Sequence, residues 1–123
     1  MSEQSFNTKS VIKYWVTMSD NDYDVMMDLF KSKRNNWTLF LGHLVIEKLL
    51  KACYVKKNKE HPVITHNLLK LALKSDIEVD DELQLQFDEI TTFNMNARYD
   101  DYNTDCTFNI VQFRQKSYWT IFN

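Results

Sequence analysis

The chain has 123 residues, 44% of them hydrophobic and 14% aromatic, so it can bury one sizeable core and is not a disordered polypeptide. One glycine and one proline leave little material for hairpin turns, which favours an all-α fold over a β fold. The net charge of −2 supplies no global positive field that would attract nucleic acid.

The charges are unevenly distributed along the chain. Lysine and arginine dominate residues 31–59, where Glu47 is the only acidic residue, and acidic residues dominate 76–105, where Arg98 is the only basic one. These two segments could attract each other within one chain or across a dimer. The first residues lack the apolar core of a signal peptide, and no apolar run is long enough to span a membrane. We therefore expect a cytoplasmic protein with no membrane partner.

The first predicted helix covers about residues 9–33, where apolar residues recur at helical spacing. Residues 1–8 are polar and are expected to form a flexible N-terminus, with residues 9–123 as one helical domain. A polar run at 19–22 marks either an exposed turn of this helix or a break between two helices. Within it, Asp22 is more typical of a solvated or capping group than of a catalytic one.

The second predicted helix, Trp37 to Lys57, is the most apolar stretch of the chain, with Asn36 as its expected N-cap. At 3.6 residues per turn, His43, Glu47 and Lys51 fall on one line, and almost every other direction is apolar. This pattern predicts a buried central helix with one polar stripe. The stripe is either an edge that faces solvent or the wall of a site.

Two small side chains of this central helix have structural interpretations. Gly42 is expected to let a neighbouring helix approach closely, and Cys53 is expected to be a buried core thiol. Cys53 and Cys106 form neither a disulfide framework nor a metal-type spacing.

Three further helices complete the prediction. A short one runs from about His66 to Ser75 with Thr65 as its cap, and a fourth begins at the acidic residues 80–82. The polar segment 96–103 reads as a loop before a last helix capped by Thr104 or Asp105. The main apolar residues predicted for that last helix are Phe108, Val111, Tyr118, Trp119 and Phe122. The sequence thus predicts an all-α, up-and-down bundle of four to five helices.

Three motifs stand in order along the chain: HLVIEKLLKA at 43–52, THNLLKLA at 65–72 and ARYDDY at 97–102. Together they resemble HEPN domains, small helical proteins, over roughly residues 10–122. One departure is Asp100, where the family often has proline. The positions that match the family pattern are Trp15, Asp22, His43, Glu47, Lys48, Lys51, Ala52, Thr65, His66, Asn67, Leu68, Arg98 and Tyr99.

The resemblance implies an HEPN-like bundle, often a homodimer with a polar groove, and several possible activities. Some relatives are metal-independent ribonucleases, some are partners of small nucleotidyltransferases, and some are thought to bind nucleotides without known catalysis. The ribonucleases resemble one another in an arginine followed a few residues later by a histidine, and no arginine of this chain is followed by histidine at that spacing. A substitute site would need His43 as base and Arg98 as cation. We favour a structural role for His43.

Other chemistries find no support in the sequence. A di-metal bundle needs Glu-x-x-His pairs, and a phosphate loop needs several glycines; the chain has neither, so no metal and no cofactor is expected. His66 is expected to be structural, holding the loop that enters the third helix.

The polar cluster predicted for this fold contains Glu47, Lys48, Lys51, Arg98 and Tyr99. We favour an ion pair in which Arg98 ties its loop to Glu47; the alternative is a groove in which Arg98 and the two lysines bind a phosphate or carboxylate. In the paired systems that the chain resembles, a nucleotidyltransferase can adenylylate a tyrosine beside the site, but ordinary loop tyrosines are the favoured interpretation here.

The function expected from the sequence is that of a non-catalytic, homodimeric HEPN protein. It would bind a nucleotide-like ligand or a partner such as a small nucleotidyltransferase, as in a toxin–antitoxin pair. The alternatives are a divergent metal-independent ribonuclease of the toxin type, which would act on RNA, and a purely structural interaction module.

Overall fold

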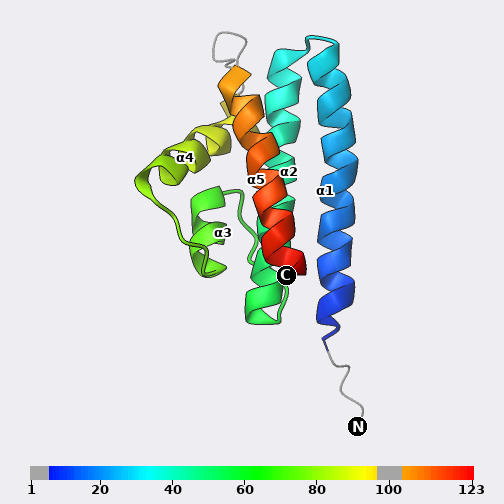
Figure 1. Cartoon of the computed structure of the whole chain (residues 1–123), viewed down its shortest axis with the longest axis vertical. Helices are drawn as coiled ribbons and strands as arrows, with labels where there is room; N and C mark the ends of the chain where they lie inside the picture. Colours follow the sequence, from blue (N-terminus) through cyan, green and yellow to red (C-terminus); the bar gives the residue numbers. More distant parts are fainter. Residues whose placement is uncertain (1–5, 97–103) are drawn as a thin grey trace.

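The computed structural model describes residues 6–96 and 104–123, and these form five helices and no strand (Figure 1). The expected all-α bundle is confirmed. The long helices α1, α2 and α5 lie roughly along one axis, and α3 and α4 pack to one side. The helices are α1 (Thr8–Lys31), α2 (Asn35–Asn58), α3 (Leu68–Lys74), α4 (Asp81–Asn96) and α5 (Thr104–Phe122).

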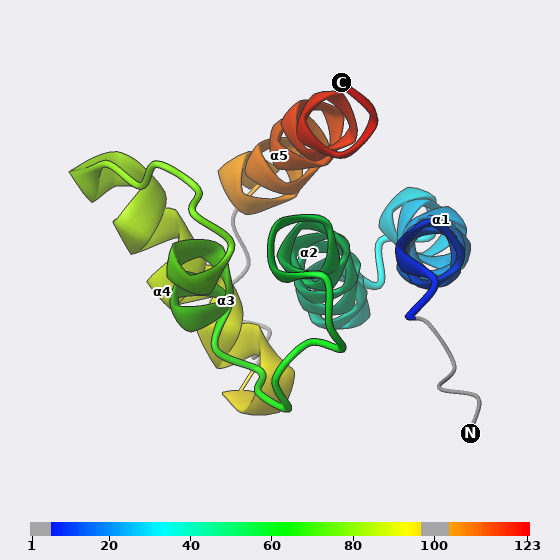
Figure 2. The same cartoon turned by 90° about the horizontal axis from the view of Figure 1, so that it is seen from below.

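Helix α2 is the centre of the molecule, with α1, α5 and the α3–α4 pair arranged around it when seen along the bundle (Figure 2). Over about three turns of α2, Leu39, Val45, Ile46, Leu49 and Leu50 have no exposed surface. This burial on nearly all sides matches the apolar sequence of the segment. The helix begins at Asn35 directly after Arg34, without a side-chain cap, so the expected cap at Asn36 is wrong.

Helix α1 is continuous through the polar run at 19–22, which therefore does not break it. The run faces partly inward, because Ser19 is fully buried and its hydroxyl donates a hydrogen bond to the Val45 carbonyl 3.0 Å away on α2. Asn7 caps the start of the helix by accepting from the Ser10 amide.

The short helix α3 begins two residues later than expected. Its N-cap is Asn67, whose side chain accepts from the Lys70 amide at 3.0 Å, and not Thr65. Thr65 instead accepts from the Asn67 amide in a local turn. Helix α4 begins as predicted within the acidic run, with the Asp80 carboxylate accepting from the Leu83 amide at 2.7 Å.

Helix α5 uses only part of its predicted apolar set for packing: Val111 and Tyr118 are partly buried against the core. The other three, Phe108, Trp119 and Phe122, are 59%, 70% and 59% exposed. The buried side chains of this helix are Cys106, Thr107, Ile110, Phe113, Ser117 and Ile121. The predicted close approach at Gly42 is confirmed here, since a Cβ on Gly42 would lie 2.4 Å from Ile110 Cδ1.

Candidate functional site

The first residue of the polar stripe of α2 is His43, and it lies in the interior, neither at the surface nor in a cleft. His43 has no exposed surface, and its Nε2 donates to the His66 carbonyl at 3.1 Å. That hydrogen bond places the ring proton on Nε2, so the buried Nδ1 is an acceptor, and it has no hydrogen-bond partner. Burial lowers the pKa of His43, against the opposing influence of the His66 carbonyl and the Glu47 carboxylate. His43 is therefore a neutral interior residue that links α2 to the chain entering α3.

One turn later, Glu47 is the centre of a small charged network. Its carboxylate, 5% exposed, accepts from Lys51 Nζ at 3.0 Å and from His66 Nδ1 at 2.9 Å. The i, i+4 order of Glu47 and Lys51 is the favourable one on a helix. The predicted structural role of His66 is confirmed, because both its ring and its carbonyl bind side chains of α2.

A second ion pair joins α1 to α2 beside this network. Lys48 Nζ lies 2.5 Å from Asp22 Oδ2, and both side chains are 19% exposed. Asp22 is thus an ion-pair partner, so the expectation of a solvated or capping group was wrong. Lys51 also lies over the Trp15 ring, 5.0 Å from its centre, in a cation–π contact. Trp15 Nε1 is a buried donor without a partner in the described structure.

These contacts define what we call the α2 cluster: Trp15, Asp22, Glu47, Lys48, Lys51 and His66. It brings together three of the predicted cluster residues, and it adds Trp15, Asp22 and His66, which match the family pattern but were not predicted to join this cluster. Arg98 and Tyr99 lie outside the described residues, so the predicted Arg98–Glu47 pair stays a prediction. The Glu47 carboxylate already has two partners without Arg98.

The α2 cluster has two chemical capabilities. The ammonium groups of Lys48 and Lys51, whose side chains are partly exposed, can bind an anion if the carboxylates release them. Its His66 ring is 63% exposed and is oriented through Nδ1 by a carboxylate, so the second ring nitrogen can accept or donate a proton.

A separate polar contact, between α1 and α5, was not foreseen from the sequence. Arg114 Nη2 lies 3.3 Å from Asp20 Oδ1, and the Tyr118 hydroxyl donates to the same oxygen. The guanidinium also lies 3.9 Å from the centre of the Tyr23 ring. The residues are far apart in sequence, so no local pattern could have paired them. We interpret this contact as a structural link.

Cys53 is 3% exposed, and burial raises the pKa of its thiol to about 12, which confirms a core thiol. Among the residues that the structure describes, no three His, Cys, Asp or Glu side chains gather as a metal site requires. No helix in the same residues is both long and apolar enough to cross a membrane.

The comparison with known families identifies the chain. The family model for the HEPN domain matches residues 12–116, which is most of its length. No curated protein and no solved structure matches the chain. The match includes α2 with its polar stripe, the entry to α3, and most of α1 and α5. The chain belongs to the HEPN domain family.

Proposed function

We propose that this HEPN domain is a non-catalytic binding module that forms a homodimer and takes a nucleotide-like ligand, or a partner such as a small nucleotidyltransferase, at the α2 cluster. The observation that carries the proposal is the enclosure of His43. A general base must reach the proton it removes, and His43 has no exposed surface and donates its ring proton to the His66 carbonyl.

The binding part of the proposal is supported by the two lysines of the cluster. Lys48 and Lys51 are adjacent cations with partly exposed side chains, 19% and 13%, on the helix that carries the family pattern. Phosphate oxygens are stronger partners for ammonium groups than neutral acceptors are. A phosphate that binds here must displace or share Asp22 and Glu47, so we expect modest affinity for a nucleotide alone.

Titration calorimetry with ATP tests the site. The double variant Lys48→Gln, Lys51→Gln removes both cations, and we expect affinity to fall by about tenfold or more. The matched control is Lys57→Gln, which removes a cation from the same helix at an exposed pair with Asp76. Equal affinity for ATP in all three proteins would contradict a nucleotide site at the α2 cluster.

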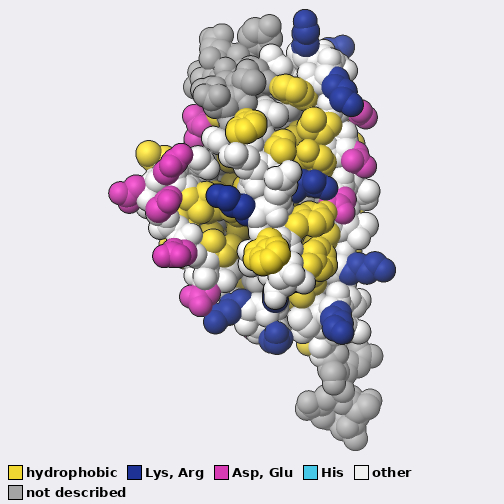
Figure 3. Space-filling model, in the orientation of Figure 1, with side chains coloured by type: hydrophobic (Ala, Val, Ile, Leu, Met, Phe, Trp, Pro, Cys, Tyr) yellow, Lys and Arg dark blue, Asp and Glu magenta, His cyan; other side chains and the backbone are white. Residues whose placement is uncertain are grey.

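Self-association is supported by the outward face of α5. Hydrophobic side chains gather along α5 and beside it toward α1 (Figure 3). They include Trp119 and Phe122, which are 70% and 59% exposed. Sedimentation equilibrium of Trp119→Glu tests this surface, with Leu85→Glu as a control because Leu85 is equally exposed on α4. A monomeric wild-type protein, or equal dissociation of both variants, would refute the α5 interface.

A divergent ribonuclease is the second candidate, and one observation favours it. The exposed His66 ring is held by Glu47 through Nδ1, the arrangement that orients a catalytic imidazole. An RNA-cleavage assay separates the two candidates. Cleavage that is lost in His66→Ala and Arg98→Ala but retained in His61→Ala, an exposed control histidine, would establish the ribonuclease and overturn the non-catalytic proposal.

A further inference from the structure

Tyr14 is an exposed aromatic residue of α1 that lies directly beside the α2 cluster. Its side chain is 56% exposed. Its ring contacts the ring of Trp15, a member of the cluster, edge to face, and the two ring centres are 5.1 Å apart. No such ring contact with the cluster is made by the other exposed aromatic side chains of the described structure, which are Trp37, Phe108, Trp119 and Phe122.

The Tyr14 ring also lies near the ammonium group of Lys51. Lys51 Nζ is 5.0 Å from the centre of the Trp15 ring, so the tyrosine ring and the ammonium group are neighbours of the same indole. The distance between them cannot exceed the sum of their two distances from that indole. In a nucleoside phosphate a single ribose separates the base from the first phosphate, and this separation is of the same order. A nucleotide whose phosphate lies over Lys51 can therefore reach Tyr14 with its base.

The second ion pair of the cluster lies along the same face of α1. Tyr14, Met18 and Asp22 follow one another at intervals of four residues, so they form one line on the helix. Asp22 is the partner of Lys48, and the half-buried Met18 lies between Asp22 and Tyr14. Helices α1 and α2 lie side by side (Figures 1 and 2). The aromatic ring and the lysines of the cluster thus border one surface formed by these two helices.

At least one face of the Tyr14 ring is not covered by Trp15. The planes of the two rings are at 80° to each other, and an edge-to-face contact covers no more than one face of a ring. Nucleobases stack on exposed aromatic faces of this kind, and they do so with little regard to base identity because every base has a π-face. Tyr14 therefore offers a platform for the base next to cations that can bind the phosphate.

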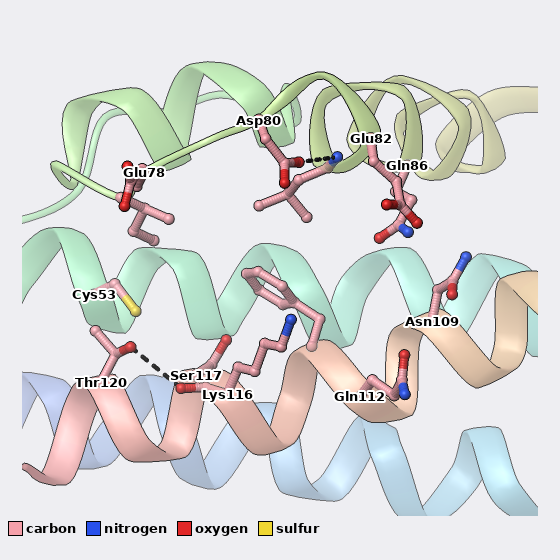
Figure 4. A pocket seen from close by; sticks show the side chains of 13 residues that line it. Cys53, Glu78, Asp80, Glu82, Gln86, Asn109, Gln112, Lys116, Ser117 and Thr120 are labelled. Atoms are coloured by element: carbon pink, nitrogen blue, oxygen red, sulfur yellow. Dashed lines mark hydrogen bonds between the residues drawn. The ribbon is translucent and has the colours of Figure 1, made fainter.

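The cavity between α4 and α5 does not suit the same ligand. It has a volume of about 370 Å³, and Glu78, Asp80 and Glu82 line it (Figure 4). Lys116 is the single cation of the lining. Three carboxylates against one ammonium group give a local negative potential, which opposes the binding of a phosphate. The lysines of the α2 cluster are the better position for the anionic end of a nucleotide.

We infer that Tyr14 is the base-stacking residue of the α2 cluster, and that the ligand is a nucleoside phosphate and not a polyphosphate or a sugar phosphate. The phosphate lies over Lys48 and Lys51, and the base lies on the uncovered face of Tyr14. This role of Tyr14 rests on the proposed binding of a nucleotide-like ligand at the cluster. Tyr14 is not among the positions that match the HEPN pattern, so the platform is a property of this chain.

Titration calorimetry of the full chain with ATP and with inorganic tripolyphosphate tests this role, because both anions have three phosphates and only ATP carries a base. Tyr14→Leu removes the ring but keeps an apolar side chain, and Tyr14→Phe keeps the ring. The matched control is Trp37→Leu, since Trp37 is 53% exposed and also makes an edge-to-face contact on its own helix, with Phe40. Circular dichroism establishes that each variant is folded.

We expect the wild-type protein to bind ATP about tenfold more tightly than tripolyphosphate. Tyr14→Leu should weaken ATP binding by about tenfold and change tripolyphosphate binding by less than about twofold, because only the stacked base is lost. Tyr14→Phe and Trp37→Leu should bind both anions as the wild-type protein does. Equal wild-type affinity for the two anions, an unchanged affinity for ATP in Tyr14→Leu, or an equal loss of both anions in that variant would overturn the stacking role.

The double variant Lys48→Gln, Lys51→Gln separates this role from the proposed function. If it weakens the binding of both anions whereas Tyr14→Leu weakens neither, the cluster binds phosphate and only the stacking is wrong. If the wild-type protein binds neither anion, or the double variant binds both as before, the nucleotide site and the stacking role both fail. Weaker ATP binding in Lys116→Gln would place the anion in the cavity between α4 and α5 and would also overturn both.

Discussion

Replacing Glu47 by alanine tests the claim that the α2 cluster is first of all a structural network. The carboxylate is 5% exposed and accepts from Lys51 and His66, so its loss leaves Lys51, whose side chain is 13% exposed, without its carboxylate partner. Removing one partner of a buried ion pair costs about 3 kcal/mol or more. For a chain of this length, each kcal/mol lowers Tm by about 4 °C, so we expect a fall of about 12 °C.

Chemical denaturation followed by circular dichroism measures this loss, and two further substitutions calibrate it. Glu47→Gln keeps one acceptor oxygen and should cost less, about 1 to 2 kcal/mol. Lys57→Ala breaks the Lys57–Asp76 pair, in which the side chains are 54% and 76% exposed, and should cost less than about 0.5 kcal/mol. If Glu47→Ala destabilises the protein no more than Lys57→Ala does, the carboxylate is not a structural centre and the argument fails.

Three other predictions concern the interior. Gly42→Ala gains about 1 kcal/mol of helix propensity but forces the new Cβ against Ile110 Cδ1. We expect urea unfolding to show a net destabilisation of about 1 kcal/mol. Adding Ile110→Val removes the clashing methyl group and should relieve this loss. Because burial lowers the pKa of His43, the unfolded chain binds more protons than the folded one below about pH 6.5, and the free energy of unfolding should fall as the pH drops through that value. His43→Gln should flatten this fall. An unchanged pH profile of stability in the variant would contradict a buried, neutral His43. Burial raises the pKa of the Cys53 thiol to about 12, so little thiolate is present at pH 8. In the Cys106→Ser variant, a thiol reagent should therefore modify Cys53 far more slowly in the folded protein than in the denatured protein. Equal rates would show that Cys53 is accessible.

The sequence predicts most strongly where one apolar pattern dominates a segment. The stretch from Trp37 to Lys57 has only one place for a polar stripe, so the central position of α2 follows from it directly. The last helix is different because it is apolar on two faces. Phe108 and Trp119 on one face and Ile110 and Phe113 on the other are equally hydrophobic, and only the position of α5 against α2 selects the second pair for burial.

The helix ends show a second limit of local patterns. Thr65 and Asn67 are both good capping residues, and both accept a backbone hydrogen bond, but only Asn67 stands at the start of α3. Which of them begins the helix depends on the chain before it. The segment before α3 must place the His66 carbonyl within hydrogen-bond distance of His43 on α2, and α3 can begin only after this contact.

The α2 cluster also could not be assembled from spacing alone. The line of His43, Glu47 and Lys51 follows from helical geometry, but the pairing of Lys48 with Asp22 joins residues on two helices. The same holds for His66, which reaches Glu47 across the loop before α3. Long-range pairs of this kind depend on the packing of α1 and α3 against α2, which no periodicity within one helix encodes.

These pairings divide the polar stripe into two parts with different capacities. His43 and the Glu47 carboxylate are turned inward and hold the entry to α3, so they are not available to a ligand without loss of the fold. Lys48 and Lys51 extend from the same helix with more of their side chains exposed, and each has one carboxylate partner that an anion could replace. A ligand site at the α2 cluster therefore has to lie over the lysines and not over the histidine. This placement separates binding from acid–base chemistry along a single helix, and it is the physical reason for proposing a binding module before an enzyme.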